Sequence, residues 1–418
     1  MKLEFGYGQG VQTVEVPEKN LIDILVSNPM EHERRGPQAV DYALANPVGA
    51  GLLRDSVKPG QKVVIITSDI SRPIPSYDVA PSVLDELYAA GVPKEDITVV
   101  FGLGSHRNQT DEERRKLIGD RAFSEVKCMD STPDDCVHFG YTSHGTPVDI
   151  SRVVAEADFR IALANVEFHY FAGYSGGVKS LMPGVSTPEA IQVNHSMMVS
   201  NDACAGKLEG NPIREDIEEA GRICPIHYIV NVVLDEHKHI VYAAAGDSVK
   251  AHRDACAYLD RMYRKEIPEK ADIVLVSQGG APKDANLYQT QKALDNAKHA
   301  VKDGGTIIVI GACNEGLGSA KFEEWLVNAP TAHSMVERIG RDFQLGGHKA
   351  AAIAMILEYA SIDLVSEMDD DFVRSIFMTP RHSAQEAFDL AMEKYGPDAK
   401  VIAMPFGGAT LPILKENA

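Results

Sequence analysis

Short runs of apolar and β-branched residues alternate with amphipathic segments along most of this 418-residue chain. Such runs occur at residues 62–67 (KVVIIT), 97–101 (ITVVF) and 159–164 (FRIALA), and a helical pattern over residues 79–90 separates the first two. Strands that are apolar throughout, with helices between them, are typical of parallel sheets covered on both faces. The sequence therefore predicts an α/β fold in which mostly parallel sheets are flanked by helices.

The alternation starts afresh in the last third of the chain, which indicates a second domain of the same class. There, a strand-like run at residues 272–276 is followed by a helical pattern over residues 289–302. The chain also exceeds the size at which a single core usually stops growing. The charged, proline-containing segment 264–270 is the best linker candidate. We therefore expect domains over residues 1–268 and 269–418, with room for the last residues to return to the first domain.

The balance of charge bears on the partners of the chain. With 60 acidic and 41 basic residues the formal net charge is −19, whereas phosphate backbones and anionic membranes attract basic surfaces. We therefore expect neither nucleic acid nor a membrane as a partner, although a few buried cations can still bind a small anion. The six cysteines form no C-x-x-C pair and the N-terminus lacks an apolar signal core, so a cytoplasmic location is predicted.

Polar clusters follow four of the predicted strands. Ligands of parallel sheets collect beyond the carboxyl ends of the strands, so these clusters are candidate sites. Three belong to the first expected domain and one to the second, and we expect an interdomain cleft to bring them together. The clusters are residues 68–73, residues 102–107, the stretch that begins at residue 167, and residues 277–280 leading to residues 286–292.

The third of these clusters combines glycines, a lysine and two histidines. Gly176 and Gly177 let backbone amides approach an anionic ligand, and Lys179 can form an ion pair or a covalent bond. His169 and His195 can ligate a metal or transfer protons. Few structural roles need all three kinds of group, so the stretch predicts a catalytic or cofactor-binding loop.

Acid–base and carboxylate-binding groups follow the neighbouring strands. His106 and His169 both stand near predicted strand ends, where imidazoles suit proton exchange near neutral pH. Asp69 and Arg72 form a D-x-x-R pair. The arginine can hold a carboxylate through two parallel hydrogen bonds, and the aspartate can orient a histidine or pair with that arginine. The alternative interpretation is that Asp69 and Arg72 form an ion pair without any further function.

Two other groupings also have alternative interpretations. Residues 173–180 nearly match the phosphate loop G-x-x-x-x-G-K-[ST], but Val178 takes the place of the glycine before the lysine and would obstruct a nucleotide phosphate. A P-loop-like nucleotide-binding ATPase therefore stays as an alternative function. Gln289 and Lys292 share one face at the start of a predicted helix, where they can point into a cleft or simply face solvent.

Taken together, these motifs resemble those of the nickel-dependent lactate racemase family, and the resemblance runs over most of the chain. Five separate matches in the expected order make the resemblance specific. They are D-x-x-R at residues 69–72, G-x-G-x-H-R at 102–107, H-x-F-A-G-x-S-G-G-x-K at 169–179, Asn194-His195, and Y-Q-x-x-K at 288–292.

The resemblance implies a racemase or epimerase that acts on a small 2-hydroxy acid, lactate or a related 2-hydroxy carboxylate. The implied mechanism is proton-coupled hydride transfer to a nickel-pincer nucleotide, which is pyridinium-3-thioamide-5-thiocarboxylic acid mononucleotide carrying nickel. By residue match, Lys179 would attach this cofactor covalently and His195 would ligate the nickel. His106 and His169 would be the catalytic acid–base pair.

The resemblance also implies supporting residues and partners. Gly176, Gly177 and Asp69 would bind or support the cofactor, and cofactor-synthesis enzymes would be maturation partners. A binding-only relative, or an epimerase of a longer hydroxy acid or a sugar acid, remains open. The residues implied to bind the substrate are Arg72, Tyr288, Gln289 and Lys292.

Overall fold

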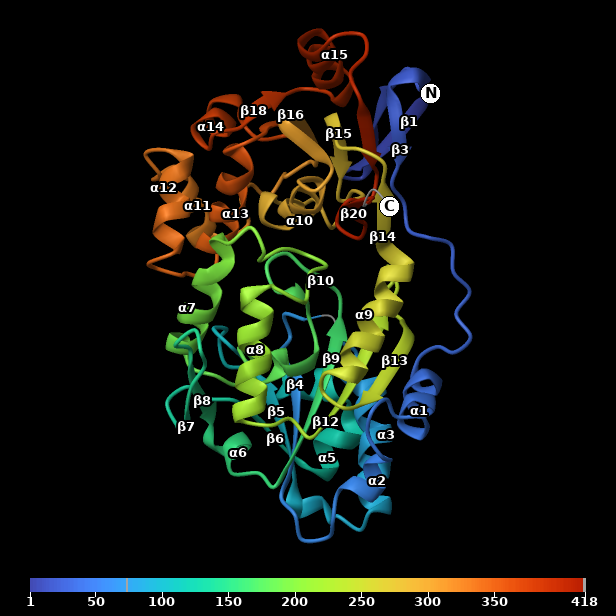
Figure 1. Ribbon diagram of the computed structural model, residues 1–418, viewed down its shortest axis with the longest axis vertical. Helices are drawn as coiled ribbons and strands as arrows, with labels where there is room; N and C mark the ends of the chain where they lie inside the picture. The colour runs from blue at the N-terminus through green and yellow to red at the C-terminus, as the bar shows by residue number, and fades with distance from the viewer. Residues whose placement is uncertain (73, 416–418) are drawn as a thin grey trace. The chain divides into compact units, whose positions relative to one another are not determined.

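The computed structural model describes residues 1–72 and 74–415 (Figure 1). Contacts between residues divide the chain into two compact units. One unit is Met30–Arg261, and the other combines Met1–Pro29 with Met262–Ala418. Among the described residues, no helix is long and apolar enough to cross a membrane.

The unit formed by residues 30–261 is built on a six-stranded sheet. The strand order is β13-β12-β9-β4-β5-β6, and all neighbours are parallel except the antiparallel pair β12 and β13. The strands are β4 (Val63–Ser68), β5 (Ile97–Gly102), β6 (Lys127–Asp130), β9 (Phe159–Val166), β12 (Tyr228–Leu234) and β13 (Ile240–Gly246).

Alternate residues of these strands face opposite layers. In β4, Val63 and Ile65 join the apolar cluster that five helices bury against one face. The other face carries the segment from residue 167 onward, which includes a 3-10 helix, η3 (Gly177–Ser180), in contact with β9 and β4. The helices of the first layer are α1 (Pro37–Ala45), α2 (Leu53–Ser56), α3 (Ser76–Ala89), α4 (Asp111–Ile118) and α5 (Asp120–Glu125).

The second layer of this unit holds elements that the sequence patterns predicted only in part. A hairpin of β7 (Cys136–Tyr141) and β8 (Pro147–Ser151) leads into α6 (Arg152–Ala155), and the backbone amide of Ser151 donates to the carbonyl of Val185 at 2.9 Å. Further along the chain come α7 (Pro188–Ser196), α8 (Pro212–Ile223) and α9 (Lys250–Tyr263).

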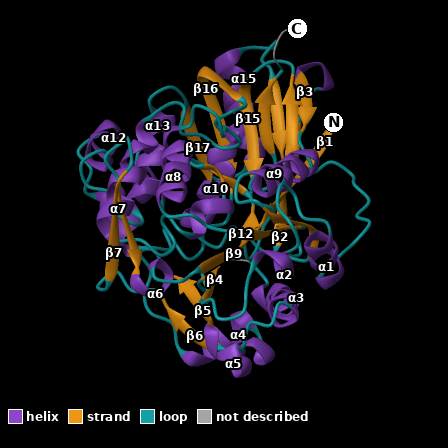
Figure 2. Cartoon of the chain, turned by 60° about the horizontal axis from the view of Figure 1, so that its bottom comes forward, coloured by secondary structure: helices purple, strands orange, loops and turns teal. Residues whose placement is uncertain are grey.

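The other unit has a fully parallel six-stranded sheet. Figure 2 shows β15, β16 and β17 side by side within it, in the order β18-β17-β16-β15-β19-β3. The strands are β3 (Leu21–Ile24), β15 (Ala271–Ser277), β16 (Val301–Ile310), β17 (Ser361–Val365), β18 (Thr379–Arg381) and β19 (Val401–Met404).

Helices and an N-terminal hairpin cover this second sheet. The hairpin β1 (Lys2–Tyr7) and β2 (Gly10–Glu15) shares one apolar cluster with α15 (Ala384–Tyr395) and the strands. A separate pair of short strands, β14 (Arg264–Ile267) and β20 (Leu411–Leu414), runs in parallel. The remaining helices are α10 (Leu287–Ala297), α11 (Ala320–Val327), α12 (Ala332–Ile339), α13 (Gly347–Leu357) and α14 (Asp370–Ser375).

The expected fold class is confirmed, since both units are α/β with mostly parallel sheets flanked by helices. The expected grouping of the N-terminus differs from the structure, because residues 1–29 belong with the C-terminal part of the chain. Strand β3 pairs with β19, and the buried Asn20 amide donates to the carbonyls of Pro397 and Ala399, both at 2.8 Å. The strand pattern of this segment did not indicate which sheet it joins.

Two further expectations need correction. The linker candidate, residues 264–270, contains the strand β14, whose partner β20 comes from the far end of the chain. The helix expected over residues 289–302 ends at Ala297, because a turn follows and Val301 begins β16. Val301 pairs with Ala271 and is fully buried, so sheet formation outcompetes the helical pattern there.

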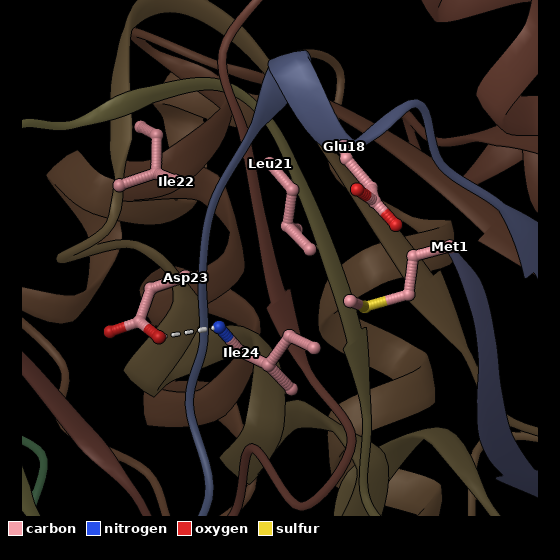
Figure 3. Close-up of a pocket in the computed structure, with 6 residues that line it drawn as sticks. All are labelled: Met1, Glu18, Leu21, Ile22, Asp23 and Ile24. Carbon is pink, nitrogen blue, oxygen red and sulfur yellow. Dashed lines mark hydrogen bonds between the residues drawn. The ribbon is translucent and has the colours of Figure 1, made fainter.

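An open depression lies beside the edge strand β3 (Figure 3). The Asp23 carboxylate accepts a hydrogen bond from the Ile24 backbone amide at 2.7 Å, so it satisfies a backbone donor of an edge strand. The depression contains none of the candidate site residues; it is lined by Met1, Glu18, Leu21, Ile22, Asp23 and Ile24.

Replacing Asn20 by alanine tests whether the N-terminal segment is part of the C-terminal unit. Asn20→Ala leaves two carbonyls without their donor, and we expect a loss of about 1–3 kcal/mol in local stability. Hydrogen exchange followed by mass spectrometry should speed up in β19 and not in β4 or β9. The control is Asn46→Ala, since the exposed Asn46 donates to one carbonyl of the other unit. Equal changes in both units would contradict the grouping.

Candidate functional site

Three neighbouring parallel strands supply the candidate site. The strands β9, β4 and β5 are adjacent in the sheet, so their carboxyl ends lie along one edge. His169 follows β9, Asp69 and Arg72 follow β4, and His106 follows β5. The two histidines thus come from strands on either side of β4. The three clusters expected in the first domain therefore lie along one edge of a single sheet.

The partly exposed His106 and the buried Asp69 form a hydrogen-bonded pair. The His106 Nδ1 atom lies 2.6 Å from Asp69 Oδ2, and the Ser71 hydroxyl donates to Asp69 Oδ1 at 2.6 Å. Burial alone would raise the pKa of the Asp69 carboxyl, but the hydrogen bonds from His106 and Ser71 and the nearby charge of Arg72 hold it below its usual value. A charged carboxylate only accepts hydrogen bonds, so the neutral imidazole carries its proton on Nδ1 and its lone pair on Nε2.

Arg72 does not neutralise that carboxylate directly. Its Nη1 atom donates to the Ser71 hydroxyl at 3.4 Å, and across residues 1–72 and 74–415 no ion pair joins Arg72 to Asp69. The simple ion pair considered for D-x-x-R is therefore not the arrangement observed. Asp69 orients a histidine, and the guanidinium keeps hydrogen-bonding capacity for another partner.

The buried ring of Phe171 gathers three of the candidate residues. Its centroid lies 4.5 Å from the ring of His169 and 4.8 Å from the ring of His195, both edge to face, and 5.9 Å from Lys179 Nζ. The lysine and the two histidines, which come from different segments, therefore share one apolar neighbour. Sequence analysis gave Phe171 no role, although it lies inside the motif.

His169 is held in a neutral state. Burial first, and then the positive charges of Lys179, His195 and Arg72, lower its pKa well below the usual value of histidine. The backbone amide of Ala172 donates to its Nδ1 atom at 3.2 Å. The neutral ring therefore carries its proton on Nε2, the opposite of the arrangement at His106.

Lys179 lies in η3, where its surroundings favour the neutral amine over the charged form. The side chain is half-buried; within the described part of the chain its Nζ atom has no hydrogen bond and no ion pair, and it lies 5.9 Å from the centroid of the Phe171 ring. Burial and the charges of Arg72 and Arg214 lower its pKa well below the usual value, against a weaker opposite effect of Glu167. A neutral amine is a nucleophile, so this lysine is suited to form a covalent bond.

The glycines before the lysine are required by packing. Gly176 and Gly177 have φ angles of 78° and 60°, which favour glycine. A Cβ at Gly176 would lie 2.8 Å from Asn231 Oδ1, and a Cβ at Gly177 would lie 2.9 Å from His252 Cγ. The loop can therefore approach the sheet and α9 closely only with glycine at both positions.

Two buried donors beneath this loop were missed by sequence analysis. Arg214 donates from Nε to the carbonyl of Ala172 at 3.2 Å and from Nη2 to the carbonyl of Tyr174, yet its Nη1 has no partner among the described residues. Asn231 Oδ1 accepts from the amide of Gly177 at 2.8 Å, and its Nδ2 likewise has no recorded partner in the described ranges. Unsatisfied buried donors suit an anionic ligand.

His195 is positioned by its neighbour on the same helix. Helix α7 begins after Thr187, whose hydroxyl accepts from the amide of Ala190, and it carries His195 in its last turn. The His195 Nδ1 atom lies 2.8 Å from Asn194 Oδ1. Within residues 1–72 and 74–415, no three His, Cys, Asp or Glu side chains are grouped so that they could hold a metal ion by themselves.

The phosphate-loop alternative lacks its structural context. In that motif a strand and a glycine loop lead directly into an α-helix, whereas Lys179 stands in a four-residue 3-10 helix followed by turns. Val178 is buried against α8, where a Cβ at Gly221 would lie 2.5 Å from Val178 Cγ1. The valine at this position therefore serves packing, and the P-loop-like ATPase is not supported.

The remaining candidate residues belong to the other unit, at the start of α10. Asn286 caps this helix by accepting from the amide of Gln289 at 3.1 Å. Lys349 donates to the carbonyl of Tyr288 and lies 4.0 Å from the centroid of its ring. Gln289 is half-buried and Lys292 is exposed on this unit. The cluster thus follows β15, at the carboxyl edge of the second sheet.

Comparisons with known proteins give one consistent result. Residues 7–206 match the family described as the lactate racemase N-terminal domain, and residues 267–411 match the lactate racemase C-terminal domain. The lactate racemase of Thermoanaerobacterium thermosaccharolyticum is 32% identical over 417 residues, which cover 97% of each chain. That of Lactiplantibacillus plantarum is 31% identical over 418 residues, covering 97% of this chain and 98% of the relative.

Solved structures agree. The structure of the lactate racemase apoprotein from T. thermosaccharolyticum superposes with a TM-score of 0.88 at 31% identity, covering 100% of both chains. A crystal structure of a Thermotoga maritima protein is 19% identical, with a TM-score of 0.64 over 93% of this chain and 100% of that one, and it shares the fold alone.

Replacing His106 by alanine should change the titration of Asp69. The variant loses the hydrogen bond and charge that lower the pKa of this carboxyl, while burial still raises it. We expect Asp69 to titrate at higher pH in His106→Ala, as followed by carboxyl 13C NMR and assigned with Asp69→Asn. In the unmodified protein the lowered pKa of folded Asp69 stabilises the fold at pH values above the pKa of the unfolded chain. This stabilisation is lost as the pH falls through the pKa of the folded state. The difference in stability between His106→Ala and the unmodified protein should therefore shrink in acid. An unchanged midpoint would contradict the pairing.

Proposed function

The chain belongs to the lactate racemase family, and from that premise we propose that it interconverts the stereoisomers of a small 2-hydroxy carboxylate, with lactate as the first candidate. Membership makes the chain an isomerase. The observation that best supports the proposal is the cluster around Phe171, where a half-buried amine and two imidazoles meet, together with the His106–Asp69 pair at the ends of the neighbouring strands of the same sheet.

The cofactor that we propose is a covalently attached nickel-pincer nucleotide, and the residues present fit it. When bound, this group supplies a hydride acceptor and donor, chemistry that no amino-acid side chain provides. Lys179 would hold it covalently, because its surroundings favour the neutral amine and it has no competing ionic partner in the described ranges. His195 would ligate the nickel, and the unsatisfied donors of Arg214 and Asn231 offer partners to an anionic group.

Hydride removal suits this class of substrate for an electrostatic reason. The Cα–H bond of a 2-hydroxy carboxylate is a very weak acid, since removing its proton would place negative charge beside an existing carboxylate. Removing the hydrogen as hydride while a base takes the hydroxyl proton avoids that second charge and leaves a neutral carbonyl. The protein then has to manage only the hydroxyl proton and the position of the carboxylate.

The two histidines supply the proton chemistry from two sides. His106 presents the lone pair of Nε2 and can accept the substrate hydroxyl proton, and the Asp69 carboxylate stabilises the imidazolium that forms. His169 presents Nε2–H and can donate to the substrate oxygen. Because these residues follow strands on either side of β4, they can serve opposite faces of the substrate, as racemisation requires.

We assign the substrate carboxylate to Arg72, whose guanidinium is not consumed by an ion pair with Asp69. Tyr288, Gln289 and Lys292 are proposed as further substrate-binding residues on the strength of the family motif. Cofactor-synthesis enzymes are the proposed maturation partners, and the cytoplasm is the proposed location. Fixed cations would keep the carboxylate in place while the carbonyl turns its other face.

Mass and metal analysis tests the attachment. Protein produced together with cofactor-synthesis enzymes should carry nickel and a covalent mass increment, and Lys179→Ala should lose the increment because the nucleophilic amine is gone. His195→Ala should keep the increment and lose nickel. Lys207→Ala, which removes an exposed lysine paired with Asp202, is the control and should keep both. An unchanged mass in Lys179→Ala would exclude the proposed attachment.

Kinetics of His106→Ala tests the chemistry. Loss of this acid–base group should slow racemisation of lactate by at least about 100-fold without loss of nickel. The matched control is His138→Ala, because His138 has the same Nδ1–carboxylate distance of 2.6 Å to Asp149 but is exposed on the β7–β8 hairpin.

The same reaction run in D₂O distinguishes hydride from proton transfer. If hydrogen leaves carbon as hydride, the product of the unmodified enzyme should carry no solvent deuterium at C2, whereas proton abstraction would introduce it. A chiral screen of other 2-hydroxy acids under the same conditions then ranks the substrates. Activity retained in His106→Ala, or deuterium at C2, would overturn the proposed mechanism.

A further inference from the structure

A buried polar chain stands behind His195 and ends at a carboxylate. Asp216, on α8, is fully buried and accepts hydrogen bonds from the hydroxyls of Thr142 and Thr146, the latter at 2.7 Å. Both threonines lie in the turn of the β7–β8 hairpin. The amide of Asn194 adds a third hydrogen bond to the same carboxylate at 2.7 Å. Three donors from two other elements therefore converge on this side chain.

The orientation of the Asn194 amide follows from its partners. Its nitrogen faces two acceptors, Asp216 Oδ2 at 2.7 Å and the backbone carbonyl of Ile213 at 3.3 Å. Two acceptors require the NH₂ group at this end, so the amide oxygen must face the other way. That oxygen lies 2.8 Å from Nδ1 of His195. Asn194 is fully buried, so water does not compete for these positions.

We infer that Asn194, oriented by Asp216, is a positioning residue that fixes the tautomer of His195. The amide oxygen can only accept, so the proton of the neutral imidazole lies on Nδ1 and the lone pair lies on Nε2. This is the tautomer that a metal ligand needs, and groups behind a ligating histidine typically fix it in this way. The inference rests on the proposed function in one respect, namely that His195 ligates nickel.

An amide in this position differs from a carboxylate in one respect. It accepts the Nδ1–H hydrogen bond without placing a formal charge against the ring. The carboxylate is the next group along the hydrogen-bonded chain, Asp216, where three donors surround it. The helix that carries the ligand is thereby tied to α8 and to the hairpin through one set of hydrogen bonds.

The tautomer can be read directly in the full-length protein. Nitrogen-15 NMR of histidine-labelled protein distinguishes Nδ1–H from Nε2–H, with His195→Ala for assignment. We expect Nδ1–H in the unmodified protein and loss of this preference in Asn194→Ala. Asn194→Asp keeps an acceptor oxygen toward the ring and should restore Nδ1–H even if stability falls. Asn20→Ala, which also removes a buried amide with two acceptors but in the other unit, should leave the signal unchanged.

Nickel retention provides the second readout. In cofactor-loaded protein challenged with a chelator, Asn194→Ala should release nickel about 10- to 100-fold faster than the unmodified protein, and Asn20→Ala should not. An Nε2–H tautomer in the unmodified protein overturns the inference, as does unchanged nickel release in Asn194→Ala. The unmodified spectrum decides the tautomer even if Asn194→Ala does not fold.

Failure of the proposed function is distinguishable from failure of this inference. If loaded protein holds nickel equally well in His195→Ala, the assigned ligand is wrong. The tautomer result, obtained without cofactor, then still reports whether Asn194 orients the ring.

Discussion

The charges of Arg72 and Arg214 act on the same two half-buried groups, Lys179 and His169, and little acidic charge offsets them. Glu167 has a weak opposing effect on the lysine and is exposed. Burial and repulsion together favour the uncharged amine, which is the nucleophilic form, and the uncharged imidazole, which presents Nε2–H. The crowding of cations costs folding free energy, and the reactivity of the site depends on that same crowding.

Such crowding arises because three parallel strands end side by side. Each strand of the β9-β4-β5 series passes through an apolar core, and the chain turns polar only at its carboxyl end. The loop after β9 then folds back over the sheet, so that Phe171 supplies an apolar wall for Lys179 and two imidazoles. The glycines at 176 and 177 make this return possible, since larger residues would collide with β12 and α9. The sheet thus fixes the positions of the candidate side chains, and the returning loop covers them with apolar surface.

The sequence predicted those parts of the site that stand at strand ends or inside a dense motif, such as His106 and Lys179. The sequence did not indicate a role for Arg214 or Asp216. A charged residue on an amphipathic helix is expected to face solvent, and only tertiary packing shows that these two are buried. Asn231 could have been found, since a polar residue within the buried run IVNVVL needs a partner. The assignment of residues 1–29 depended on long-range strand pairing, which local patterns do not encode.

Three histidines of this unit illustrate how the surroundings set chemistry that the residue type leaves open. In each, Nδ1 is engaged by a different group: a carboxylate at His106, a backbone amide at His169, and a side-chain amide oxygen at His195. An acceptor at Nδ1 leaves the lone pair on Nε2, and a donor leaves the proton there. The same side chain thus presents a lone pair on Nε2 at His106 and His195 and a proton on Nε2 at His169. These differences arise from single neighbouring atoms, which explains why a motif identifies the histidines but not the division of roles among them.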